Sequence, residues 1–261
     1  MSEALSRYLR DMMTHHGPLS VAQFMEICLS HPHYGYYMTR DPFGREGDFT
    51  TAPEISQIFG ELLGAWAADC WLQMGSPEPF IWLDCGPGRG TLMADMIRAT
   101  RKVPGMHDAA DFYMLEASDH LQAIQAQTCR HVNNLTWIST LTQMPHDRPI
   151  LVTGNEFLDA LGVRQFQYRN GQWHERVIGL DADNGLTFGL SPVPDAISRR
   201  LPDTGQAEEC VYEISPQREA FVHDLCARLA TQGGAGLFVD YGYTGPAMGD
   251  TVQAVKNHVF C

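Results

Sequence analysis

FIWLDCGPGRG, residues 80–90, is the stretch of sequence that decides the fold. Its first four residues are apolar and predict a short buried strand, and Asp84 and a loop with three glycines follow that strand. Glycine lets a chain turn sharply and lets a ligand approach its backbone closely. An apolar pattern at helical spacing then covers residues 92–97. This order of strand, glycine loop and helix predicts the first unit of a parallel α/β sheet.

Strands and helices continue to alternate after the glycine loop. Further strands are predicted over residues 112–115, 137–138, 150–152 and 237–239, and helices over residues 120–129 and 216–232. Because helical crossovers cover both faces of a parallel sheet, this alternation predicts a doubly wound parallel α/β sheet. One region departs from the alternation. There, Phe166 and Tyr168 alternate with polar residues, and Asn170-Gly171 predicts the turn of an inserted antiparallel hairpin.

The chain before the first strand is predicted to be helical. Ser20 to Gln23 has the sequence of a capping box, and Thr51 to Glu54 has a second one that opens another helix. The apolar stripe of that helix is predicted to be core, and it comprises Ile55, Ile58, Phe59, Leu62, Leu63 and Trp66. The predicted domains are a helical extension with a lid loop, residues 1–78, and a core domain, residues 79–261, with hairpins inserted at about residues 163–190.

The composition excludes several classes of partner. The formal net charge is −13, with 44% hydrophobic and 19% charged residues, which is the profile of a globular enzyme. Because nucleic-acid binding relies on clustered Lys and Arg, no nucleic-acid partner is expected, and an acidic chain suits a small zwitterion or a basic peptide. No apolar run reaches the length of a membrane span, so no membrane insertion is expected. Residues 1–13 have the features of neither a signal peptide nor a transit peptide.

Cysteine and histidine usage bears on location and on metal binding. The seven cysteines lie far apart and none forms a C-x-x-C motif, which is typical of reduced thiols in a cytosolic protein. A cytoplasmic location is therefore expected. The tightest group of histidines, His31-Pro32-His33, lacks the helical spacing of metal ligands, and no metal site is predicted.

The glycine loop predicts a cofactor site, because ligands of open parallel sheets bind at the carboxyl ends of the strands. Gly86, Gly88 and Gly90 have the spacing G-x-G-x-G. A dinucleotide loop usually has the spacing G-x-G-x-x-G, with a pyrophosphate at the helix N-terminus. The tighter loop favours S-adenosylmethionine, which carries no phosphate. The alternative is a strand-to-helix turn that binds no ligand.

Two carboxylates are predicted to bind the same cofactor. Glu116 ends the second predicted strand, where it could accept hydrogen bonds from both ribose hydroxyls. Asp84 precedes the loop and could hold the ammonium group of the methionine part, directly or through water. The structural alternatives are a solvated acid at a strand end for Glu116 and a helix-capping acid for Asp84.

A third polar segment, Asn155 to Asp159, follows the fourth predicted strand and would face the transferred methyl group. Methyl transfer is an in-line displacement, so the enzyme must align the nucleophile and accommodate a proton. Glu156 and Asp159 could hold an amine or a guanidinium, since paired carboxylates match the guanidinium fork. Asn155, Glu156 and Asp159 are therefore the predicted catalytic residues. A helix-capping role is the alternative for Asp159.

These segments belong to a longer series of motifs that covers nearly the whole chain. The motifs are residues 31–37, 47–57, 59–61, 86–92, 155–161 and 239–243. In this order they resemble the MidA-like methyltransferases, the family of the mitochondrial complex I assembly factor that methylates an arginine of a respiratory subunit. The chain departs from the family pattern at Asp84, where Glu is usual, and at Gly162, where Pro is frequent.

The resemblance implies a Rossmann-like methyltransferase fold, S-adenosylmethionine as cofactor, and an arginine of a respiratory-complex protein as acceptor. A homodimer is left open. Residues 47–57 are predicted to fold over the cofactor site as a lid or acceptor groove, with a capped helix start as the alternative. The family pattern continues beyond residues 249–251, so the C-terminal strands of the sheet are expected to be missing.

Two other functions compete with this one. An NAD(P)-dependent oxidoreductase shares the order of strand, glycine loop, helix and acid, but the loop spacing and the absence of a Tyr-x-x-x-Lys pair speak against it. A catalytically impaired assembly or scaffold protein would retain the fold without transferring a methyl group.

Overall fold

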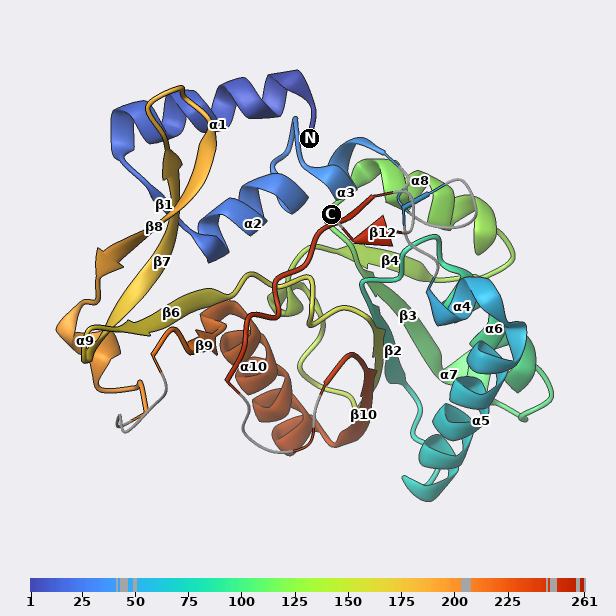
Figure 1. The fold of residues 1–261 in the computed structure, drawn as a ribbon. Coiled ribbons are helices and arrows are strands. Elements are labelled where there is room, and N and C mark those ends of the chain that lie inside the picture. The colour runs from blue at the N-terminus through green and yellow to red at the C-terminus, as the bar shows by residue number, and fades with distance from the viewer. Residues whose placement is uncertain are drawn as a thin grey trace. The chain divides into compact units, whose positions relative to one another are not determined.

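The computed structural model describes residues 1–40, 42, 47–48, 51–202, 208–242, 244, 248–256 and 259–260, and Figure 1 shows the chain as a ribbon. The chain divides into two compact units. The first unit comprises Met1–Tyr36, Ala160–Glu219 and Gly242–Ala254, and the second comprises Tyr37–Asp159, Ala220–Tyr241 and Val255–Cys261.

The second unit is built on a five-stranded parallel sheet with the order β10-β5-β2-β3-β4. Its strands are β2 (Phe80–Cys85), β3 (Ala110–Leu115), β4 (Leu135–Ile138), β5 (Ile150–Asn155) and β10 (Gly234–Val239). Its helices are α3 (Tyr36–Thr39), α4 (Ala52–Ile55), α5 (Gln57–Gln73), α6 (Thr91–Thr100), α7 (Met106–Ala109), α8 (Asp119–Thr128), the 3-10 helix η1 (Leu141–Gln143) and most of α10 (Pro216–Gln232). A short pair, β11 (Val255–Lys256) and β12 (Val259–Phe260), completes the unit.

The strand order reverses between β2 and β5, because β3 and β4 extend the sheet on one side of β2 and β5 returns to its other side. Such a reversal creates a crevice at the carboxyl ends of the two strands. The predicted Rossmann-like α/β fold is confirmed, and the glycine loop follows β2 directly at this point.

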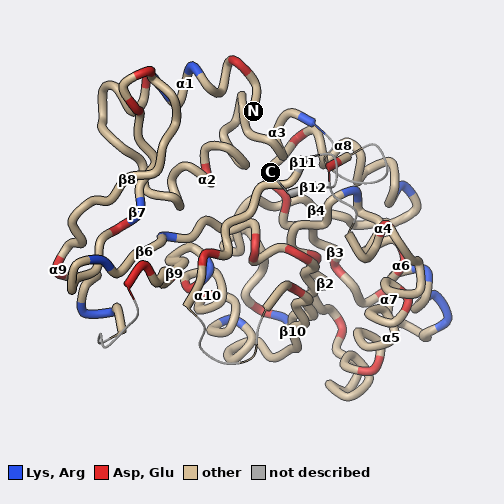
Figure 2. The backbone as a smooth tube through the Cα atoms, viewed as in Figure 1, with Lys and Arg blue, Asp and Glu red and all other residues tan. Residues whose placement is uncertain are grey.

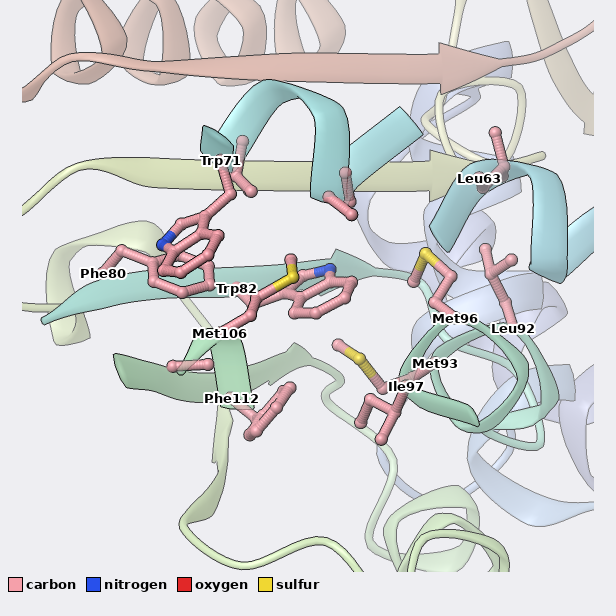
Figure 3. Packing of buried hydrophobic residues seen from close by; sticks show 14 of the residues in the cluster. Leu63, Trp71, Phe80, Trp82, Leu92, Met93, Met96, Ile97, Met106 and Phe112 are labelled. Carbon is pink, nitrogen blue, oxygen red and sulfur yellow. The ribbon is translucent and has the colours of Figure 1, made fainter. Parts of the chain in front are cut away.

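Both faces of the central strands β2 and β5 are buried, and alternate residues of β2 belong to different clusters. Phe80 and Trp82 belong to one cluster with the helices α5 and α6, whereas Ile81 and Leu83 belong to the other with α10. The Trp82 and Phe112 rings stack with centroids 5.6 Å apart. In Figure 3 the labelled aromatic residues of the first cluster gather at one end together with Met106, and the labelled aliphatic residues Leu63, Leu92, Met93, Met96 and Ile97 lie at the other.

Helix α5 lies very close to α6 because two glycines occupy the contact. A Cβ atom at Gly60 would lie 2.5 Å from Cβ of Asp95, and one at Gly64 would lie 2.8 Å from the carbonyl oxygen of Met96. Leu63 lies on the same side and is buried. The side of α5 that carries these glycines is therefore the face that packs on α6.

Two predictions about this region are wrong. Thr51 makes no side-chain capping bond, so the second capping box is absent, and the expected single helix is broken at Ser56, which caps α5 instead. The predicted core stripe is also split, since Ile55, Ile58 and Leu62 are 72%, 62% and 65% exposed. The physical reason is that α5 has apolar residues on two sides. The side with Gly60 and Gly64 packs on α6, and the side with Ile58 and Leu62 is exposed.

The first unit contains a five-stranded antiparallel sheet and the helices that pack with it. The strands are β1 (Leu19–Ser20), β6 (Arg164–Arg169), β7 (Gln172–Leu180), β8 (Leu186–Pro192) and β9 (Val211–Ile214), and the helices are α1 (Glu3–His16), α2 (Val21–Ser30) and α9 (Asp195–Ser198). The sheet has the order β1-β7-β6-β9, and β8 also pairs with β7. Asn170 and Gly171, with φ of 52° and 79°, form the predicted turn between β6 and β7.

The helices of this unit pack on the inserted strands. Leu5, Leu9 and Met13 of α1 form one buried cluster with Val21 and with Ile178 of β7. The capping box of Ser20 and Gln23 is present as predicted. Residues 1–36 therefore group with the inserted hairpins and residues 37–78 with the parallel sheet, whereas the predicted domain boundary lay at residue 78.

Candidate functional site

The glycine loop after β2 adopts a backbone that requires glycine. Gly86, Gly88 and Gly90 have φ of 63°, 56° and 82°, all in the left-handed region. A Cβ atom at Gly86 would lie only 2.8 Å from Cδ2 of Phe157. The loop therefore lies against the segment that follows β5, and its conformation keeps the backbone accessible at the crevice.

Asp84, on β2 just before the loop, is fully buried. One carboxylate oxygen accepts a hydrogen bond from the Thr153 hydroxyl at 3.4 Å, and the other has no partner among the described residues. Burial raises the pKa of Asp84 to about 8. A buried carboxylate oxygen without a partner is costly, so this position fits a ligand that brings a cationic or donor group.

Glu116 follows β3 and faces the same crevice. One carboxylate oxygen accepts from the backbone amide of Ser118 at 2.8 Å, and the other accepts from the Gln125 side chain at 3.1 Å. Burial raises the pKa of Glu116, and these hydrogen bonds oppose the rise. The backbone amide of Ala117 is a third donor to this carboxylate. A carboxylate offers about four acceptor positions, so at least one remains for a ribose hydroxyl.

The predicted catalytic segment lies at the end of β5. Asn155 is the last residue of the strand, and Glu156 adopts φ of 49°, a left-handed conformation that is rare for a residue with a side chain. Such strain persists only where surrounding contacts hold it, and it clusters at functional sites. Burial raises the pKa of Glu156, while hydrogen bonds from Tyr241, Asn155 and the backbone amide of Ala52 lower it.

Asp159 and Glu156 lie near the same side chain, since the charges of both carboxylates affect the pKa of Tyr37. Burial, and then the charges of Asp159 and Glu156, raise the pKa of Tyr37. The structure thus brings Asn155, Glu156 and Asp159 together with the hydroxyls of Tyr37 and Tyr241. Their catalytic role stays a prediction.

Asp240, immediately after β10, was not predicted as a site residue. One of its carboxylate oxygens accepts hydrogen bonds from the backbone amides of Leu158 at 2.9 Å and Asp159 at 3.2 Å. The other accepts a hydrogen bond from the backbone amide of Tyr241 at 2.8 Å. The amide of Glu156 donates to the carbonyl of Val239 at 2.9 Å. The end of β10 therefore holds the strained segment after β5. The signal was available, since Asp240 ends a predicted strand as Asp84 and Glu116 do.

Residues 52–54 connect the glycine loop with the acidic segment. The Thr91 hydroxyl donates to Glu54 at 2.6 Å, and Arg89 lies 3.9 Å from the other Glu54 oxygen, while the amide of Ala52 donates to Glu156. The predicted lid covers residues 47–57, of which Phe49 and Thr50 lie outside the described residues. Its described end lies beside the glycine loop, and its role as a lid stays a prediction.

Figure 2 shows that Lys and Arg, drawn in blue, are scattered along the chain. In the ranges that the structure describes, no three His, Cys, Asp or Glu side chains are placed to hold a metal ion. None of the described helices is both long enough and apolar enough to cross a membrane.

A glycine loop at the reversal of a parallel sheet, with carboxylates at the ends of β2, β3 and β5, defines a Rossmann-like protein with a nucleoside site. The comparison with known proteins is more specific. Residues 62–261 match the family model described as putative S-adenosyl-L-methionine-dependent methyltransferase, and the chain belongs to this family. The resemblance drawn from the sequence motifs is confirmed.

Relatives agree with this assignment. The chain is 37% identical to the protein arginine methyltransferase NDUFAF7 homolog, mitochondrial, of Drosophila melanogaster, over 98% of this chain and 64% of the relative. It is 32% identical to the protein arginine methyltransferase NDUFAF7, mitochondrial, of Danio rerio, over 99% of this chain and 66% of the relative. The chain thus spans less than two thirds of the length of these relatives.

A solved structure from Burkholderia thailandensis, which contains bound S-adenosyl-homocysteine, superposes with a TM-score of 0.79 at 28% identity, covering 92% of this chain and 63% of that one. The curated relatives also correct one expectation. They are named mitochondrial, so the cytoplasmic location predicted from the cysteine pattern is contradicted. Reduced cysteines do not distinguish compartments that keep thiols reduced.

Proposed function

We propose that this chain binds S-adenosylmethionine and transfers its methyl group to an arginine of a protein. The observation that carries the proposal is the contact between Gly86 and Phe157, which places the glycine loop against the acidic segment after β5. A donor site and an acceptor site must adjoin for an in-line displacement. The names of the curated relatives support the reaction and the acceptor class.

The residues around the loop fit this cofactor. Asp84 would accept from the ammonium group, Glu116 would accept from the ribose hydroxyls, and the left-handed glycines leave room for close approach to the backbone. Bound there, the cofactor supplies a methyl group on a positively charged sulfur. The family match and the S-adenosyl-homocysteine bound in the Burkholderia structure support this assignment.

The acidic segment fits a cationic acceptor. Glu156 and Asp159 can accept from the N–H groups of a guanidinium, and Asp240 holds the backbone that carries them. An arginine is protonated at neutral pH, so carboxylates that hold it also orient the nitrogen that must lose a proton. The raised pKa of Glu156 favours proton uptake at this position. An acceptor in a respiratory-complex subunit, a role in complex I assembly and a homodimeric state remain proposals of the family resemblance.

Two measurements test the proposal. Calorimetry with S-adenosyl-homocysteine and with NAD separates a methyltransferase from an oxidoreductase, and we expect binding of the first ligand alone. Incubation with isotopically labelled S-adenosylmethionine and arginine-containing proteins, followed by mass spectrometry, should then find labelled methylarginine. Binding without transfer to any arginine would favour the non-catalytic scaffold, and NAD binding alone would refute the proposal.

A further inference from the structure

Gln125 of α8 is a fully buried glutamine that contacts three separate parts of the parallel-sheet unit: the glycine loop, the end of β3 and strand β4. Its amide nitrogen donates to the carbonyl of Gly88 at 2.8 Å and to the carboxylate of Glu116 at 3.1 Å. Its amide oxygen accepts from the indole nitrogen of Trp137 at 2.8 Å. Both amide hydrogens and one lone pair of the oxygen are therefore used, which fixes the orientation of the amide.

We propose that Gln125 is a positioning residue that selects for the ribose hydroxyls of the cofactor. This inference rests on the proposed function. Gln125 holds one oxygen of Glu116, the Ser118 amide holds the other, and the unused acceptor positions of the carboxylate then point in fixed directions. The same side chain holds the carbonyl of Gly88, so the ribose carboxylate and the glycine loop keep one spacing.

The amide of Gln125 is held in one orientation because the side chain is buried and each end of the amide has a hydrogen-bond partner. The Trp137 indole anchors the amide oxygen, which prevents the amide from flipping and presenting its oxygen to Glu116. A satisfied polar network in a low-dielectric interior specifies one arrangement, whereas removal of one member leaves its partners unsatisfied. Replacement of Gln125 by an apolar residue would leave the carboxylate of Glu116 with one fewer anchor.

Gln122 provides a matched control on the same helix. Its side chain also donates to Glu116, but to the backbone carbonyl, at 3.0 Å, and Gln122 is half-buried. A Gln122→Met variant therefore removes a hydrogen bond to the same residue without touching the carboxylate that would meet the ribose.

The experiment measures affinity by calorimetry for S-adenosyl-homocysteine and for its 2′-deoxy and 3′-deoxy analogues. Gln125→Met should weaken S-adenosyl-homocysteine binding roughly tenfold or more, since Glu116 and the carbonyl of Gly88 each lose a buried hydrogen-bond donor. It should weaken binding of the deoxy analogues by a smaller factor, so discrimination by the hydroxyls shrinks. Gln122→Met should change neither affinity nor discrimination by more than about twofold.

A second variant guards against a general loss of structure. Gln125→Glu keeps the size and the acceptor for Trp137 but places an ionisable carboxyl group against Glu116. A protonated carboxyl group can donate to Glu116 and a charged one repels it, so the affinity deficit relative to the wild type should grow as the pH rises. A deficit that is independent of pH indicates a structural role only and overturns the inference.

The outcomes separate this inference from the proposed function. If Gln125→Met weakens all three ligands by the same factor, or behaves like Gln122→Met, the inference is wrong while cofactor binding stands. If the wild-type chain binds no S-adenosyl-homocysteine, the proposed function fails and the inference falls with it.

Discussion

Glu54 accepts a hydrogen bond from the hydroxyl of Thr91 at 2.6 Å, although 37 residues separate them in the chain. Thr91 is the first residue of α6, immediately after the glycine loop, and Glu54 belongs to the short helix α4. The amide of Ala52, also in α4, donates to Glu156. One turn of helix therefore contacts both the proposed cofactor loop and the proposed acceptor carboxylate.

The first prediction concerns this link. Glu54→Ala should weaken S-adenosyl-homocysteine binding roughly five- to tenfold, because the Glu54 side chain is only 17% exposed and its loss removes the partner of Thr91. Calorimetry measures the effect. Glu61→Ala is the control, since Glu61 of α5 pairs with Arg98 of α6 at 2.8 Å and so also links a preceding helix to α6, but away from the loop. Equal losses of affinity in the two variants would show that Glu54 acts only through helix packing.

The glycine loop gives the second prediction. Gly88→Val should reduce cofactor affinity at least about a hundredfold, since a branched side chain at φ of 56° distorts the loop and fills the approach to its backbone. Gly105→Val is the control, because Gly105 has φ of 77° and lies beside α7. Both variants should lose stability in thermal unfolding, and only Gly88→Val should lose binding. Retained binding in Gly88→Val contradicts the assignment of the loop.

The third prediction separates binding from transfer. Glu156→Gln should bind S-adenosyl-homocysteine within about twofold of the wild type, because Asp84, Glu116 and the loop are untouched. Methyl transfer should fall by roughly a hundredfold or more, the usual magnitude for a lost proton-accepting group. Single-turnover transfer and calorimetry on the same sample measure the two effects. A loss of affinity as large as that of Gly88→Val would mean that Glu156 belongs to the cofactor site.

The fourth prediction is a pH dependence of stability. The pKa of Asp84 is about 8 in the folded chain and about 3.9 in an unfolded chain, so the folded state holds the extra proton between these values. Stability from this residue should therefore be present at low pH and fall as pH rises from about 4 to 8, by at most about 1.4 kcal/mol per pH unit. Asp84→Asn removes the ionisation.

Thermal unfolding of the ligand-free chain at pH 5 and pH 8 tests this dependence. The melting temperature of Asp84→Asn should decline less than that of the wild type over this interval. Parallel declines would show that Asp84 is ionised when buried, and the orphaned oxygen would then need another explanation.

Local patterns predicted much of the site before its geometry was known. The strands, the glycine loop and the acids at the strand ends follow from short-range rules, because carboxyl ends of parallel strands meet at one edge of a sheet. That rule brought Asp84, Glu116 and Asn155 to one crevice. The same rule applies to Asp240, which was not predicted as a site residue.

Other features had no local signal. Tyr37 precedes the first strand of the parallel sheet in the chain, yet it lies near the acidic segment. Gln125 has no feature in the sequence that distinguishes it from other helical glutamines, and only the structure shows its three partners. The exposed Ile58 and Leu62 fit the same stripe as the buried Leu63. A helical pattern identifies apolar sides but cannot tell which side meets a neighbour, because the neighbour is distant in the chain.

The sequence by itself determined the class of fold, the family and the position of the glycine loop, because local patterns and short motifs specify each of them. Only the tertiary structure decided that Glu54 meets Thr91 and that Gln125 joins Gly88 to Glu116. These contacts arise when elements far apart in the chain pack together, and hydrogen-bond geometry then fixes which polar side chains face one another.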